Sequence, residues 1–266
     1  MISIVTAYYN RKKLFQETLK SIARSKFKDF ELIAVDDGSL PEHRIEDLSF
    51  EFPFLRVIRL EPENKWYINP CVPFNIGMRE AKGDIIVLQN PECLHVHDVL
   101  TYVSKNVNDS NYITISTYGF NQALTDSIPR HCANGTLVYL LNSQPQQPYV
   151  GWDSIGWYNH PRFRPVYYHF CSAMTRNNMA KLKGFDEKFA HGIGFDDDEL
   201  LVRIVLLGLR PIIETSVSVI HQYHDTVAWN KPNVNELTER NRKILLSVTR
   251  RKFTYDIDQK NLWNGI

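Results

Sequence analysis

Four side chains that can bind a metal or a phosphate group lie within eight residues of this sequence. They are Asn90, Glu92, His95 and His97. Carboxylate oxygens suit divalent cations such as Mg²⁺, whereas a His-x-His pair in an extended segment places both imidazoles on one face, a spacing used for zinc or iron. The segment therefore predicts either a carboxylate-based site or a histidine-based one.

The apolar patterns around these residues predict the elements that position them. Strands are expected at residues 2–8, 30–35, 55–60 and 84–89, and helices at 13–25, 74–81 and 98–107. Later residues predict a strand at 168–175, a short helix around Met179, a strand at 211–220 and a terminal helix at 235–251. This alternation is typical of an α/β fold with a mixed, mostly parallel sheet flanked by helices.

Acidic residues follow apolar runs at three places. Asp36-Asp37 and Asn90-Pro91-Glu92 each come after an expected strand, and a run of four acids opens an expected helix at residues 196–199. Because ligands bind outside the carboxyl ends of strands in open α/β sheets, we expect the first two groups to share one crevice. Carboxylates also cap helices, but four in succession exceed what capping requires.

The middle of the chain, residues 119–167, is rich in proline and aromatic residues. We expect loops there that form a lid or an acceptor-binding wall. The exposed faces of aromatic rings suit sugar stacking, although core packing explains such residues equally well. The aromatic candidates are Trp152, Trp157, Tyr158 and Trp229.

The composition limits the classes of partner. Lys and Arg total 31 against 30 Asp and Glu, a balance that argues against nucleic acid or an acidic membrane as the main partner. No apolar run reaches the roughly 18 residues that span a bilayer, and Met1 leads directly into a strand, so we expect a cytoplasmic protein with no transmembrane segment. Peripheral attachment to a membrane stays open. The four cysteines form no C-x-x-C pair, which favours buried free thiols.

Four segments together resemble family 2 glycosyltransferases with the GT-A fold, and the resemblance runs from Ile2 to His224. The segments are SIVTAYYNRKKLFQETLKSI, FELIAVDDGS, PFNIGMREAKGDIIVLQNPE and GFDEKFAHGIGFDDDELLVRI. The resemblance implies a single GT-A domain over residues 1–266. Within it, residues 1–118 would bind the nucleotide sugar, 119–234 the acceptor, and 235–266 would form a C-terminal helix and tail.

The resemblance also implies a set of donor-binding residues. In the family an Asp after the second strand pairs with the nucleotide base, a role that falls to Asp36 or Asp37 here, with Thr6 nearby. The full set of donor-binding candidates is Thr6, Tyr8, Asp36, Asp37, Asn75 and Asn90.

Register relates the segment at residue 90 to the Asp-x-Asp motif of the family. There the first Asp lies seven residues after the Gly of an Ala-x-Gly turn, and seven residues after Gly83 is Asn90. Asn90-Pro91-Glu92 therefore replaces Asp-x-Asp. Glu92 keeps a carboxylate at the position that usually contacts the metal, and a single Glu is a workable anchor for Mg²⁺ or Mn²⁺.

The remaining roles also come from the resemblance. A His after the last sheet strand often completes the metal shell in such enzymes, and VIHQYHD offers both His221 and His224. Asp197 matches the catalytic base of an inverting transfer, with Asp196 second. Such a base takes the proton of the acceptor hydroxyl as that hydroxyl attacks the anomeric carbon.

The implied activity is transfer of a sugar from a nucleotide-diphospho sugar, with UDP favoured, to a hydroxyl of a glycan or glycoconjugate acceptor. Three alternatives remain at this point. An inactive nucleotide-sugar-binding protein fits the missing first Asp. A nucleotidyltransferase shares the α/β sheet and Mg²⁺, although TAYYNRKK contains no Gly for a phosphate loop. A metal-dependent hydrolase would use His95 and His97.

Overall fold

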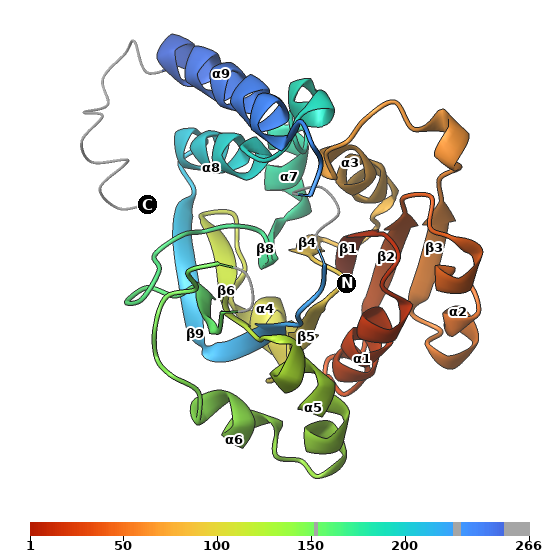
Figure 1. The fold of residues 1–266 in the computed structure, drawn as a ribbon. Coiled ribbons are helices and arrows are strands. Elements are labelled where there is room, and N and C mark those ends of the chain that lie inside the picture. Colours follow the sequence, from red (N-terminus) through yellow and green to blue (C-terminus); the bar gives the residue numbers. More distant parts are fainter. Residues whose placement is uncertain (152–153, 226–229, 253–266) are drawn as a thin grey trace.

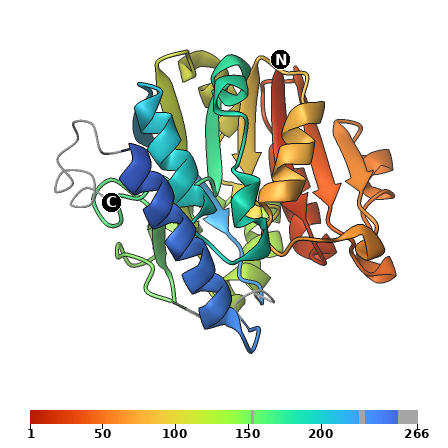
Figure 2. The same ribbon diagram turned by 90° about the horizontal axis from the view of Figure 1, so that it is seen from above.

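One mixed sheet with helices on both faces forms the centre of the molecule (Figures 1 and 2). The computed structural model describes residues 1–151, 154–225 and 230–252. The strands are β1 (Ile2–Tyr8), β2 (Phe30–Asp36), β3 (Leu55–Arg59), β4 (Ile85–Gln89), β5 (Cys93–His95), β6 (Asn111–Gly119), β7 (Gly156–Asn159), β8 (Cys171–Thr175) and β9 (Arg210–His221). Their order in the sheet is β3-β2-β1-β4-β8-β6-β9-β5, and β7 pairs with β6.

The parallel part of the sheet comes from the first third of the chain. Strand β1 lies between β2 and β4 and is parallel to both, and β3 pairs in parallel with β2. The carboxyl ends of β1, β2 and β4 therefore meet at one edge. The character of the sheet changes at β8, which is antiparallel to both β4 and β6, while β6 and β9 are again parallel. The expected mixed sheet is confirmed, with three of its parallel pairs among β3, β2, β1 and β4 and a fourth between β6 and β9.

Two apolar layers cover the faces of the parallel strands. Alternate residues of β1 point to opposite faces, so Ile4 packs with helices α1 (Lys12–Ala23) and α4 (Val99–Asn106). Val5 instead packs with α3 (Cys71–Glu80), α7 (Arg176–Leu182) and α8 (Asp196–Leu206). Figure 2 shows α8 and α9 (Val234–Lys252) side by side on this second face. Every strand and helix expected in the first 107 residues is present, within three residues at each end.

The short elements lie in the connections. They are α2 (Leu48–Glu51) and the 3₁₀ turns η1 (Pro41–His43), η2 (Pro62–Asn64) and η3 (Glu187–His191). The late strand and the terminal helix also lie where the sequence predicts them, whereas β8 begins at Cys171, three residues later than expected. Among the described residues no helix combines the length and the apolar character needed to cross a bilayer.

The middle of the chain is more regular than its composition indicates, so the expectation of loops at 119–167 is wrong for the residues that form two helices and a strand. It contains α5 (Gln122–Ala133), α6 (Leu137–Asn142) and β7. Asn121 caps α5 by accepting a hydrogen bond from the amide of Leu124, and Pro129 is accommodated inside this helix. A separate apolar cluster explains the order, because Ile128 and Leu141 pack there with Tyr118 and Trp157.

Candidate active site

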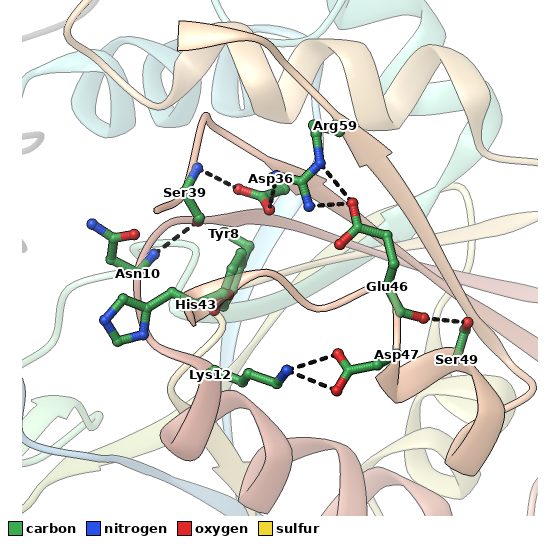
Figure 3. Close-up of polar contacts among 10 residues, drawn as sticks. All are labelled: Tyr8, Asn10, Lys12, Asp36, Ser39, His43, Glu46, Asp47, Ser49 and Arg59. Carbon is green, nitrogen blue, oxygen red and sulfur yellow. Dashed lines mark hydrogen bonds and ion pairs between the residues drawn. The ribbon is translucent and has the colours of Figure 1, made fainter. Parts of the chain in front are cut away.

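A polar network surrounds the buried Asp36 at the carboxyl end of β2 (Figure 3). Asp36 is fully buried, its Oδ1 accepts a hydrogen bond of 2.9 Å from the amide of Ser39, and its Oδ2 lies 3.1 Å from Nη1 of Arg59. Arg59 in turn donates from Nε to Glu46 at 2.6 Å. The carboxylate of Asp36 thus shapes the turn, as expected for a buried charge with both a cationic and a hydrogen-bonding partner.

Asp37, the next residue, is held from the other side by the loop that precedes α3. Its carboxylate accepts hydrogen bonds from Nζ of Lys65 and from the hydroxyl of Tyr67, both at 2.6 Å. Its side chain is 12% exposed, whereas that of Asp36 is fully buried. Of the two adjacent carboxylates, Asp37 is therefore the one with surface available to a ligand.

The other early candidates occupy different surroundings. Thr6 is buried, and its hydroxyl has no hydrogen-bond partner among the described residues. Tyr8 is buried against α1 and donates its hydroxyl to the carbonyl of His43 at 2.6 Å (Figure 3). Asn75, on α3, donates to the carbonyl of Phe185 and accepts from its amide, at 3.0 and 2.8 Å. The side chains of Tyr8 and Asn75 thus have structural partners within the fold.

Glu92, His221 and His224 form a compact group at the end of the sheet. Strand β5 is antiparallel to β9 and pairs Cys93 with His221, so residues that are distant in the sequence become neighbours. Oε1 of Glu92 lies 3.1 Å from Nε2 of His221 and 3.3 Å from Nε2 of His224. Oε2 of the same carboxylate accepts a hydrogen bond of 2.7 Å from Nη1 of Arg11.

Glu92 is buried, at 1% exposure, and the groups around it favour the ionised carboxylate. Burial alone would raise the pKa of this group, but Arg11 and the two histidines hold it well below its usual range. Burial lowers the pKa of His221, although Glu92 acts in the opposite direction. The lowered pKa favours the neutral imidazole that a metal requires.

The chemistry of this donor set fits a divalent metal ion. The ligand atoms of Glu92, His221 and His224 all lie within 4.8 Å of one another. One carboxylate oxygen and two imidazole nitrogens form a mixed set. This set suits a transition ion such as Mn²⁺ better than it suits Mg²⁺, which prefers oxygen ligands.

The side chain of Asn90 is half-buried, and its backbone amide donates to the carbonyl of Phe170 at 3.0 Å, where β4 meets β8.

His95 and His97 do not join this group. His95 is buried, and its Nε2 lies 2.8 Å from Oε1 of Gln89; burial lowers its pKa to about 3. Nδ1 of His97 accepts a hydrogen bond of 3.1 Å from the amide of Ser218. Both rings therefore have structural partners, and the histidine-based metal site finds no support in this geometry.

The first turn of α8 presents three consecutive aspartates, each with a different partner. Asp196 is buried and accepts a hydrogen bond of 2.8 Å from Nδ2 of Asn69. Oδ1 of Asp197 forms an ion pair with Nδ1 of His169. Asp198 accepts from the hydroxyl of Tyr168 at 3.0 Å. The fourth acid, Glu199, forms an ion pair with Arg203 one turn along the helix.

Burial and like charge raise the pKa of two carboxyl groups in this turn. Burial raises the pKa of Asp196 to about 7, and the Asp197 carboxylate adds to the effect. Burial and Asp197 also raise the pKa of Asp198. Asp196 is thus a carboxyl group that changes charge near neutral pH.

The segment before β8 joins the two acidic groups. His169 contacts Asp197, and the next residue, Phe170, accepts the amide hydrogen bond from Asn90. The ring of Phe170 also packs edge-on against His221, at 5.5 Å between centroids. The first turn of α8 and the Glu92 group therefore flank one short stretch of chain.

Sequence reasoning missed three residues that shape these groups. They are Arg11, Asn69 and His169. Arg11 is a common surface type, and nothing in the spacing of Asn69 or His169 indicates that they face α8. Of the aromatic candidates, Trp157 is buried and Tyr158 stacks on Tyr149 at 3.9 Å between centroids. Trp152 and Trp229 lie outside the described residues.

A family model described as glycosyl transferase family 2 matches residues 3–180. The chain belongs to this family. Two relatives of this chain bear the description uncharacterized glycosyltransferase. The protein from Haemophilus influenzae is 32% identical over 112 residues, covering 41% of this chain and 36% of that protein. YwdF from Bacillus subtilis is 30% identical over 112 residues, covering 42% of this chain and 40% of that protein. The matched segments span well under half of either relative.

Solved structures of glycosyltransferases share the fold of this family 2 chain. A mannosyltransferase from Pyrobaculum calidifontis, in complex with GDP-Man and Mn²⁺, superposes with a TM-score of 0.58 at 17% identity, covering 97% of this chain and 65% of that one. TarS residues 1–349 from S. aureus, in complex with UDP, give a TM-score of 0.62 at 14% identity, covering 98% and 68%. These likenesses confirm the GT-A fold.

Proposed function

We propose that this family 2 chain transfers a sugar from a nucleotide-diphospho sugar to an acceptor hydroxyl, with metal assistance and inversion of configuration. The observation that carries the proposal is the grouping of Glu92, His221 and His224 beside the carboxyl ends of β1, β2 and β4. Family membership supplies the reaction class, and the UDP, UDP-GlcNAc and GDP-Man complexes of fold neighbours support a nucleotide sugar as donor.

The donor nucleotide is assigned to the turn at the end of β2. Asp37 has surface available to the base. The hydroxyl of Thr6, which has no hydrogen-bond partner in the described part of the chain, lies on the neighbouring strand β1. Asp36 supports the turn from beneath through Ser39 and Arg59. We assign to Tyr8 and Asn75 a supporting role, and to Asn90 a hydrogen bond to the ribose or to a water molecule.

Glu92, His221 and His224 would hold the ion, preferably Mn²⁺ and otherwise Mg²⁺. A bound divalent ion supplies Lewis-acid stabilisation to the departing diphosphate. Arg11 contributes a permanent positive charge at the same place, since it already lies 2.7 Å from Glu92.

Asp197 is the proposed general base, with Asp196 as the second candidate. A base must be exposed to the acceptor, and the side chain of Asp197 is 31% exposed whereas Asp196 as a residue is 6% exposed. The acceptor oxygen attacks the anomeric carbon from the side opposite the diphosphate. Its proton passes to Asp197, and the bonding electrons of the broken C–O bond leave with the diphosphate. We assign acceptor binding to residues 119–234, with a glycan or glycoconjugate as the acceptor.

The test is turnover of a donor panel. Purified protein is mixed with UDP-, GDP- and dTDP-sugars and Mn²⁺, and free nucleotide is measured. We expect release from a UDP-sugar first, with loss of release in the presence of a chelator. Absence of release with every donor, together with no donor-induced rise in melting temperature, would contradict the proposal.

A second candidate is a nucleotide-sugar-binding protein without catalysis. It is favoured by Asn90, which replaces one carboxylate, and by Arg11, which already neutralises the other. This candidate predicts that donors raise the melting temperature without nucleotide release under any metal condition. The donor panel therefore separates the two candidates directly.

A further inference from the structure

The buried side chain of His169 contacts two aromatic rings and a carboxylate in the first turn of α8. Its ring packs edge-on against Phe74 and Phe185, at 4.9 and 5.0 Å between centroids. Its Nδ1 forms the ion pair with Oδ1 of Asp197. The side chain of His169 is 9% exposed and that of Asp197 is 31% exposed. One end of the pair is therefore enclosed, and the other is open.

We propose that His169 is a positioning residue for the base Asp197, a role that rests on the proposed glycosyl transfer. The imidazole fixes Oδ1 and supplies a positive charge, and it leaves Oδ2 of Asp197 for the acceptor hydroxyl.

The charges around this pair explain why Asp197 needs a cation. Asp196 and Asp198 flank it on α8, Tyr112 and Tyr168 add hydroxyl groups, and the two phenylalanines that enclose His169 are neutral. Neighbouring carboxylates disfavour ionisation of one another, and a cation in contact favours it. His169 is the cation that offsets this repulsion at Asp197.

The protonation of His169 agrees with this role. Burial alone would lower its pKa, but the Asp197 carboxylate, with a smaller contribution from Asp196, raises it above the usual value. In the transfer, the acceptor proton moves to Oδ2 of Asp197 as the new C–O bond forms and the diphosphate departs with the bonding electrons. His169 keeps its own proton throughout, so it orients and polarises the base without exchanging a proton.

Two variants separate orientation from charge. His169→Phe keeps an aromatic ring against Phe74 and Phe185 and removes both the contact with Asp197 and the charge. His169→Asn keeps an amide donor near the position of Nδ1. We expect His169→Phe to lower kcat by about 10- to 100-fold with an unchanged KM for the donor, and His169→Asn to recover part of the loss.

The pH dependence of kcat/KM distinguishes a positioning role of His169 from a purely structural one. Both variants lack the cation that favours ionisation of a contacting carboxylate, so the acidic limb of kcat/KM should move upward by about one pH unit in both. The matched control is His131→Phe, because His131 also makes one side-chain contact through Nδ1, to Thr136 at 2.8 Å, and it lies on α5. An unchanged acidic limb in folded His169→Phe protein would overturn the proposal.

A second measurement does not depend on turnover. The ring signals of His169, assigned by their loss in His169→Phe, are titrated by NMR in the wild type and in Asp197→Asn. We expect the pKa of His169 to fall by about one unit when Asp197 loses its charge. A titration unmoved by Asp197→Asn would overturn the pairing. If the wild type turns over no donor, the proposed function fails, and this titration still decides whether His169 and Asp197 act as a pair.

Discussion

Glu92 and Asp196 are both buried carboxylates, at 1% and 6% exposure, and their pKa values move in opposite directions. Burial raises both. Around Glu92, the cation Arg11 and two imidazoles overcome burial and keep the group ionised. Around Asp196, the Asp197 carboxylate adds to the effect of burial, and the pKa rises to about 7.

The difference between these two regions shows how the carboxyl group serves two kinds of chemistry. A permanently ionised carboxylate among nitrogen donors is suited to holding a cation. Carboxylates that titrate near neutral pH are suited to proton transfer. The partners, more than the depth of burial, assign the role, and changing the partners tests that assignment.

The largest effect is expected from Glu92→Gln. The amide keeps the shape but loses the negative charge that the metal requires, so we expect a loss of donor turnover on the order of 1,000-fold and loss of Mn²⁺ binding. Nucleotide release and Mn²⁺ titration by electron paramagnetic resonance measure the two effects. Glu214→Gln is the matched control, since this carboxylate lies on β9 and is bonded to Tyr102. Retention of full metal-dependent turnover in Glu92→Gln would show that the carboxylate of Glu92 does not hold the metal.

Asp197→Asn should have the next largest effect. Loss of a general base typically costs 100-fold or more, so we expect kcat to fall by about 100- to 1,000-fold while donor binding and Mn²⁺ binding persist. The neighbouring Asp198→Asn should lose less than about 10-fold, because Asp198 is half-buried and its carboxylate accepts a hydrogen bond from Tyr168. Equal losses in the two variants would argue against a unique base at position 197.

A smaller effect concerns stability and pH at Asp196. This group takes up its proton near pH 7 in the folded protein and near 3.8 when unperturbed, so the folded state binds the extra proton between these values. The stabilisation is fully present below about pH 4 and is lost as pH rises through 7. Relative to Asp196→Asn, we expect wild type to lose on the order of 3 to 4 kcal/mol of unfolding free energy between pH 4 and 8. Urea unfolding at several pH values measures this, and parallel pH dependences would contradict it.

The smallest effect is expected from Arg11→Gln. The guanidinium of Arg11 lies 2.7 Å from Oε2 of Glu92 and repels an incoming cation. Its removal should lower the Mn²⁺ concentration needed for half-maximal binding by about 3- to 10-fold. Lys12→Gln, which removes the adjacent lysine paired with Asp47, is the control and should leave Mn²⁺ binding unchanged. Weaker Mn²⁺ binding in Arg11→Gln would show that Arg11 supports the ion.

Local patterns were sufficient to predict the first third of the fold. The β-branched run of β1, the apolar run of β4 and the helical spacing of α1 are encoded in neighbouring residues, and the structure has these elements where expected. Helices α5 and α6 were missed because prolines and aromatics obscure their pattern. Their order comes from packing on Tyr118 and Trp157, which is a tertiary contact.

The sequence by itself determined which residue types the site contains and where they fall along the chain. The count from Gly83, compared with the family motif, made Glu92 a candidate, and the acidic run made Asp196 and Asp197 candidates. Only the tertiary structure decided which groups meet. The antiparallel pairing of β5 with β9 brings His221 to Glu92 across more than a hundred residues, and the segment before β8 brings His169 to Asp197. The physical reason is that pKa values and metal ligation depend on charges a few ångströms away in space, which spacing along the chain does not specify.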